Sequence, residues 1–155
     1  MSPDDTSSAD ARRGPFWDIL DGRRDPSGAA VLLGWELIAV DPQAGTIEAA
    51  FTATEQFTNL AGHVQGGFLA AMLDDTLGPA LVATLGEGQW APTLDLHVQF
   101  LAAAKPGRLI GHGRVTRRGR DVAFLAGELC ADAVVVATAT AVAAIREAPP
   151  TARAN

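Results

Sequence analysis

The sequence is poor in the residues that several enzyme classes require. All four serines lie within the first 27 residues, so a serine nucleophile on a strand-to-helix turn in the body of the chain is excluded. The histidines, His63, His97 and His112, have no metal-ligand spacing, and we expect no metal site. No glycine-rich motif opens a helix after a strand, so the sequence predicts no nucleotide cofactor.

Cysteine and long apolar runs are also scarce. Cys130 is the only cysteine, which excludes an internal disulfide and favours a small core residue over a nucleophile. No apolar run reaches about 18 residues, which disfavours a membrane span. The acidic first residues lack the basic and apolar regions of a signal peptide. We therefore expect a cytoplasmic protein that does not bind membranes.

Positive charge is in the minority. The formal net charge is −6, whereas nucleic-acid binding requires a basic face, so no nucleic-acid partner is expected. The one local basic cluster contains Arg117, Arg118 and Arg120. It is either a solvated strand end or a site that holds substrate phosphates, and the sequence leaves both open.

What the chain does have is enough apolar sequence for one domain, since 48% of its 155 residues are hydrophobic. We place that domain at residues 12–148. Residues 1–11 and 149–155 are predicted to be flexible tails because small polar residues and proline dominate them.

Apolar patterning predicts a helix–strand–strand–helix order followed by four strands. The elements are expected at 15–20, 31–40, 46–54, 67–85, 91–102, 107–118, 121–131 and 134–146. Pro79 should kink or divide the long helix. That helix is apolar on nearly every side, so one antiparallel sheet of about six strands covers only part of it. A second copy of the chain is the expected cover for the rest.

Two adjacent carboxylates, Asp74 and Asp75, interrupt the apolar helix. Burial of an unpaired carboxylate is costly, so each needs a partner or must face a cavity. The helical wheel does not choose between them, and a structural hydrogen-bond role remains open for either.

Gln65-Gly66-Gly67 leads into the same helix. Free amide N–H groups at a helix N-terminus form a ready oxyanion site. Asp74 lies eight residues beyond Gly66, about 12 Å along a helix, so one carbonyl cannot contact both in one subunit. If both act on one substrate, the carboxylate must come from a second, antiparallel helix of a two-fold dimer.

The stretch Asn59-Leu60-Ala61-Gly62-His63-Val64-Gln65-Gly66-Gly67, continuing to Asp74, resembles the hotdog thioesterases of the PaaI type. That family shows an Asn, then His-Gly-Gly, then an acidic residue in the following helix. The similarity extends over roughly residues 30–146. It implies an α+β hotdog fold, in which an antiparallel sheet of about six strands wraps around a long central helix.

The resemblance also implies roles for individual residues. Asp74 would be the general base or nucleophile, and the Gly66 N–H would polarise the thioester carbonyl. Asn59 would position the water or the carboxylate, and Thr93 would assist the water. Gln65 replaces the family's usual histidine; it can orient by hydrogen bonding but cannot titrate. His63 is a possible substitute, although on the sequence alone a plain loop residue is the better interpretation.

The implied substrate is a small aromatic or medium-chain acyl-CoA, with no cofactor beyond the CoA that the substrate carries. Gly67 and Phe68 are expected to contact it, and Arg120 is the first candidate for the CoA phosphates. Self-association as a dimer or a dimer of dimers is expected. The main alternative is an acyl-CoA-binding hotdog protein that does not hydrolyse. An acyl-CoA hydratase would need a histidine shortly after Asp74, and a lipocalin-like carrier would lack the central helix.

Overall fold

A computed structural model of the chain describes residues 12–147. The two predicted tails, 1–11 and 149–155, lie outside the described residues. Within those residues the helices are α1 (Pro15–Leu20), α2 (Gly28–Leu33) and α3 (Gly66–Val82), with a 3-10 turn η1 (Glu55–Phe57). The strands are β1 (Glu36–Asp41), β2 (Thr46–Ala53), β3 (Gln89–Trp90), β4 (Thr93–Phe100), β5 (Gly107–Arg118), β6 (Val122–Ala131), β7 (Val134–Ala144) and β8 (Arg146–Glu147).

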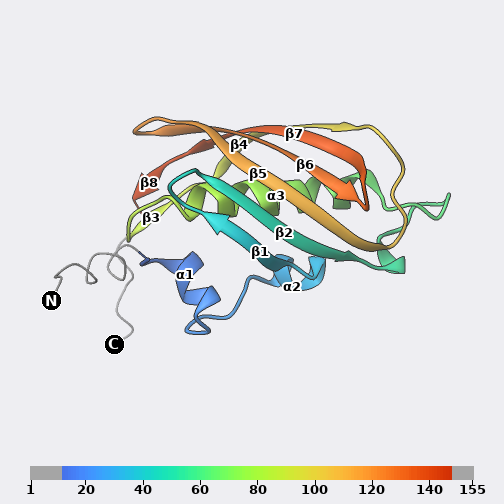
Figure 1. Ribbon diagram of the computed structural model, residues 1–155, viewed down its shortest axis with the longest axis horizontal. Coiled ribbons are helices and arrows are strands. Elements are labelled where there is room, and N and C mark those ends of the chain that lie inside the picture. The colour runs from blue at the N-terminus through green and yellow to red at the C-terminus, as the bar shows by residue number, and fades with distance from the viewer. Residues whose placement is uncertain (1–11, 148–155) are drawn as a thin grey trace, which may run out of the picture.

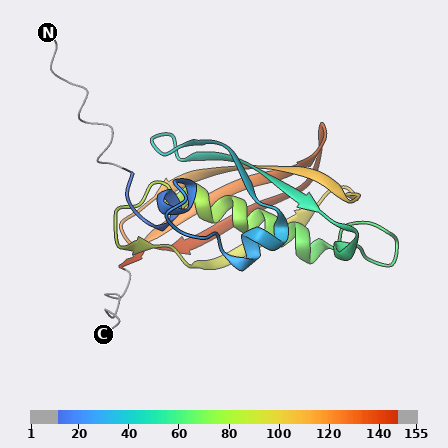
Figure 2. The same ribbon diagram turned by 90° about the horizontal axis from the view of Figure 1, so that it is seen from below.

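Six of the strands form one antiparallel sheet in the order β1-β2-β5-β6-β7-β4. Helix α3 lies along one face of this sheet, and α1 and α2 lie on the same side (Figures 1 and 2). The predicted architecture, a sheet of about six strands around a long helix, is therefore confirmed. The order leaves β4 at one edge of the sheet, and no strand of the described residues lies on its outer side.

Glycines let α3 lie close against the middle of the sheet. A methyl group on Gly111 would collide with the Thr76 hydroxyl, and one on Gly113 would lie 3.1 Å from the Thr76 methyl. On the next strand, a methyl group on Gly127 would lie 2.9 Å from Leu77. A Cβ at Gly111 or Gly127 would force a neighbour to move, and one at Gly113 would be tightly packed, so these glycines of β5 and β6 allow the short distance between helix and sheet.

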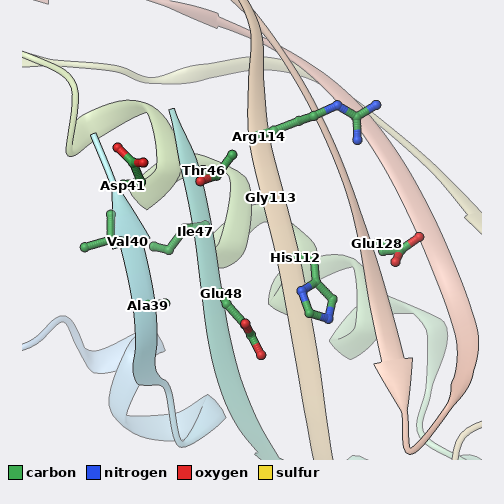
Figure 3. A pocket seen from close by; sticks show the side chains of 10 residues that line it. All are labelled: Ala39, Val40, Asp41, Thr46, Ile47, Glu48, His112, Gly113, Arg114 and Glu128. Carbon is green, nitrogen blue, oxygen red and sulfur yellow. The ribbon is translucent and has the colours of Figure 1, made fainter. Parts of the chain in front are cut away.

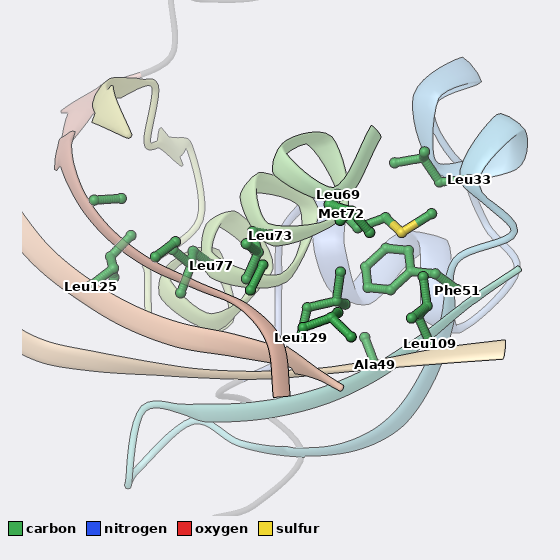
Figure 4. Close-up of a cluster of buried hydrophobic side chains, with 14 of the residues drawn as sticks. Leu33, Ala49, Phe51, Leu69, Met72, Leu73, Leu77, Leu109, Leu125 and Leu129 are labelled. Carbon is green, nitrogen blue, oxygen red and sulfur yellow. The ribbon is translucent and has the colours of Figure 1, made fainter. Parts of the chain in front are cut away.

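The core fills the space between α3 and the concave face of the sheet (Figure 4). Met72, Leu73 and Leu77 of the helix are fully buried against residues such as Phe51 and Leu129 of the strands. Burial of one such side chain contributes about 1.5–3 kcal/mol, so this layer is the main stabilising contact of the domain.

Pro79 does not divide α3 as expected, because the helix runs without interruption from Gly66 to Val82. A proline cannot donate the backbone hydrogen bond that the carbonyl four residues earlier would accept. That carbonyl belongs to Asp75, and the Trp35 indole N–H donates to it at 2.9 Å. A tertiary contact thus replaces the missing helical bond.

The predicted strand at residues 31–40 is wrong in its first part, because residues 31–33 belong to α2. The Ser27 hydroxyl caps this short helix by accepting from the Ala30 amide at 3.1 Å. Gly34 ends it in the left-handed conformation, with φ 64°. The strand begins only at Glu36. The long helix also ends at Val82 rather than at residue 85, and the small β3–β8 pair was not predicted.

Candidate active site

Asp74 lies on the flank of α3 that faces the edge strand β4. Its Oδ1 accepts a hydrogen bond of 2.9 Å from the Thr93 hydroxyl at the start of that strand. Asp74 is half-buried. The structure therefore joins two residues predicted separately from the sequence, a carboxylate and a hydroxyl 19 positions apart.

Asp75, the next residue of the helix, has different surroundings. Its Oδ2 is shielded from solvent and has no hydrogen-bond partner among the described residues. Burial raises the pKa of Asp75 to about 6, and the charge of Asp74 adds to that rise. Of the two carboxylates, only Asp74 has a hydroxyl donor beside it.

The first turn of α3 presents free amide groups. Gly66 and Gly67 open the helix after Gln65, and their N–H groups make no hydrogen bond within residues 12–147. Gly67 is exposed, and a methyl group on it would meet no atom within 4 Å. Two unpaired donors in an open position are what binding a carbonyl oxygen or oxyanion requires.

A groove of about 410 Å³ runs past Gly66. Most of its lining residues have apolar side chains, and two, Asn59 and His63, are polar. The apolar lining residues are Val64, Leu69, Phe100, Leu101, Ala102, Ala103 and Ala104. The Phe100 ring lies so close to Gly66 that a Cβ there would be 3.0 Å from it, so a larger residue would push against the ring in this part of the groove.

Asn59 uses its side-chain oxygen to shape the loop before α3. Asn59 Oδ1 accepts from the Ala61 amide at 2.9 Å and from the His63 amide at 3.2 Å. The Asn59 amide in turn donates to the His63 carbonyl at 2.7 Å. The structure thus shows Asn59 holding the loop, and it lines the groove as well.

Gln65 precedes the helix as its N-cap residue, but its side chain makes no capping hydrogen bond. Gln65 is exposed and does not line the groove, whereas His63 does. Phe68 stacks on Phe57 with ring centroids 4.1 Å apart, which packs the first turn of α3 on η1.

Arg120 lies at the β5–β6 hairpin, away from the residues above. Its guanidinium is almost fully exposed and pairs with Asp121 at 3.1 Å. The neighbouring Arg118 instead donates to the Thr84 carbonyl at 2.6 Å, beyond the C-terminal end of α3. Thr84 is ten residues from Asp74, about 15 Å along a helix axis, so the hairpin does not touch the carboxylate within one chain.

Another hollow, of about 490 Å³, lies elsewhere on the surface. Ile47 and Gly113 point toward α3, so their neighbours along the strands, among them Glu48 and His112, point away from it. Figure 3 shows these polar side chains on the face of the sheet opposite the helix. None of the predicted site residues lines this hollow.

Two kinds of functional feature are absent from residues 12–147. No group of three or more His, Cys, Asp or Glu side chains is placed to hold a metal ion there. No helix in that part of the chain is long and apolar enough to cross a membrane.

Comparison with known proteins decides the family. The pattern of the thioesterase superfamily matches residues 61–138, about half of the chain, and this match includes the Gln65-Gly66-Gly67 turn and Asp74. The chain belongs to the thioesterase superfamily. A comparison with curated proteins found no match.

Solved structures show which members of the thioesterase superfamily this chain is similar to. A phenylacetic acid degradation-related protein of Ralstonia eutropha JMP134 is 43% identical over 84% of this chain and 99% of its own, with a TM-score of 0.83. The PaaI protein of the E. coli phenylacetic acid degradation operon is 20% identical over 86% and 94%, with a TM-score of 0.75. A Haemophilus influenzae thioesterase is 17% identical over 92% and 98%, with a TM-score of 0.76. The PaaI-type hotdog fold is thereby confirmed.

Proposed function

We propose that the protein hydrolyses acyl-CoA thioesters in a site that two copies of the chain form together. The observation that carries the proposal is that one edge strand, β4, contacts both halves of the site. Thr93 at its start bonds Asp74, and Phe100 at its end packs against Gly66.

The outer side of β4 has the features of a surface that a second copy of the chain would cover. An eight-residue edge strand exposes unpaired backbone groups, which proteins normally cover or blunt. The apolar side chains of Leu94, Phe100 and Leu101 beside that edge are each more than half exposed. A second copy that pairs along β4 supplies hydrogen-bond partners for the backbone and cover for these side chains.

Two-fold symmetry then completes the site. When β4 pairs antiparallel with its own copy about its midpoint, Thr93 of one chain lies opposite Phe100 of the other. Asp74 therefore approaches Gly66 of the second copy, although the two are about 12 Å apart along α3 in one chain. The exposed residues Gly67 and Ala71 leave room on the helix for that approach.

The chemistry follows from these groups. The amides of Gly66 and Gly67 hold the carbonyl oxygen, where negative charge develops during attack. Asp74, as general base, takes a proton from water while the water oxygen attacks the acyl carbon. When the C–S bond breaks, the CoA thiolate accepts that proton, and the free acid leaves. Thr93 keeps the Asp74 carboxylate in one orientation.

The groove supports a small aromatic or medium-chain acyl group, because its 410 Å³ are lined mainly by Leu, Phe and Ala. CoA enters as part of the substrate, and Arg120 is proposed to meet its phosphates at the hairpin. With one cysteine and no internal disulfide possible, we place this activity in the cytoplasm.

A thiol-release assay with an acyl-CoA panel tests the proposal. The wild type should release CoA, and Asp74→Asn should lower kcat/KM by about 10²–10⁴-fold because the base is lost. Asp75→Asn is the matched control and should keep most of the activity. Binding of acyl-CoA without turnover by the wild type would instead establish the non-hydrolytic alternative.

A further inference from the structure

His63 and Gln65 lie two residues apart in the loop before α3, but only His63 lines the groove that passes Gly66. We propose that His63, not Gln65, is the side chain of this loop that hydrogen-bonds the thioester, as an additional catalytic residue. The inference rests on the proposed function and assigns a contact within that same site.

The loop holds His63 in a fixed place. Asn59 makes two hydrogen bonds to the backbone of His63: its Oδ1 accepts from the His63 amide, and its own amide donates to the His63 carbonyl. On the next residue, the Val64 amide donates to Ala104 at 2.8 Å, and Val64 also bridges to Thr58. A group that must meet a reacting atom needs such support, because a small misplacement costs rate.

The His63 imidazole is also available to hydrogen-bond a substrate. It makes no hydrogen bond or ion pair within the described part of the chain, and His63 is half-buried. Apart from Asn59, the other lining residues have apolar side chains or none. His63 therefore provides the one imidazole donor on the wall that also carries the Gly66 amide. We assign its hydrogen bond to the thioester carbonyl oxygen, beside that amide, with no proton transfer.

Steady-state hydrolysis of the best acyl-CoA of the panel tests this assignment. His63→Leu should lower kcat/KM by about 10²-fold, the effect of losing one oxyanion donor. His63→Gln keeps a donor and should recover most of that loss. Leu60→Ala, a fully exposed position in the same loop, is the matched control and should match the wild type. Gln65→Leu should lose less than His63→Leu.

A double-mutant cycle separates catalysis from loop structure. If Asn59 acts through His63, the losses from Asn59→Ala and His63→Leu should be strongly non-additive, while His63→Leu leaves Tm within a few degrees of the wild type. If the wild type is active and the kcat/KM of His63→Leu is within twofold of it, the inference about His63 is wrong but the proposed function stands. The same holds if Gln65→Leu loses more kcat/KM than His63→Leu does. A wild type that turns over no acyl-CoA overturns the proposed function as well.

Discussion

Asp74 and Asp75 are adjacent in the sequence, yet the helix turns them toward different surroundings. Asp74 faces the edge strand and accepts from Thr93, while the Oδ2 of Asp75 is shielded and unpartnered. The helical wheel could not choose between them, because that choice depends on which strand lies beside each flank. Only the resemblance to PaaI-type thioesterases favoured Asp74 beforehand.

Thr93 offers a first test at this scale. Thr93→Val keeps the shape of the side chain but removes the hydroxyl that donates to Asp74, so kcat should fall by about tenfold, as expected for one lost hydrogen bond to a charged group. Thr93→Ser should retain activity. Steady-state kinetics on both variants check this, and equal kcat values for Thr93→Val and the wild type would contradict it.

We expect the Asp75 carboxyl to make the free energy of unfolding depend on pH. Its pKa is about 6 in the folded chain against 3.8 for the ordinary group, so the folded state binds the proton more tightly. The carboxyl therefore costs almost no stability below about pH 4, and its cost grows between about pH 4 and 6 and is nearly constant above that. Allowing for partial solvent exposure, Asp75→Asn should stabilise the protein by about 1–2 kcal/mol at pH 8.

Urea unfolding of the wild type and Asp75→Asn at pH 4 and pH 8 measures this difference. The two proteins should nearly coincide at pH 4 and separate at pH 8. The same gap at both pH values would show that Asp75 does not carry the extra proton.

At the scale of elements, the sequence predicted the sheet well because its strands are long and regularly patterned. The four strands after α3 occur where expected, and so does β2. The prediction for residues 31–33 is wrong because a short apolar run does not distinguish a buried strand from a helix, whereas the Ser27 cap and Gly34 at the C-terminal end select a helix. The β3–β8 pair has two residues per strand, too few for any periodicity to show.

The predicted break at Pro79 rests on the helix propensity of proline alone, whereas the helix continues because the Trp35 indole donates to the Asp75 carbonyl. Trp35→Phe should cost about 1–2 kcal/mol, because the Asp75 carbonyl then loses the donor that replaces the helical bond. In a Pro79→Ala background the residue-79 amide can donate to that carbonyl, so the same substitution should cost clearly less. Thermal or urea unfolding of the four proteins gives this cycle, and equal costs in both backgrounds would exclude the compensation.

At the scale of the molecule, the proposed site needs two copies of the chain, since Asp74 and Gly66 are about 12 Å apart along α3 in one chain. The sequence pointed to the carboxylate and the Gly-Gly turn, and the resemblance to PaaI-type thioesterases added the Thr93 hydroxyl. The roles of these residues and the second copy stay predictions. The sequence could not show that the Asn59 side chain bonds the loop backbone, or that His63 lines the groove and Gln65 does not. Both depend on how the loop folds, with the Val64 amide bonded to the Ala104 carbonyl. Nor could the sequence show that Arg120 is paired with Asp121.

Subunit complementation tests the shared site most directly. Asp74→Asn removes the base, and Gly66→Val blocks the groove against Phe100, so each variant alone should be inactive. In a mixed dimer, one site combines an intact Asp74 with an intact Gly66 from different chains. An equimolar mixture after subunit exchange should therefore regain about a quarter of the wild-type activity. Native mass spectrometry would show whether mixed dimers form. If they form and the mixture is still as inactive as each variant alone, the shared site is contradicted.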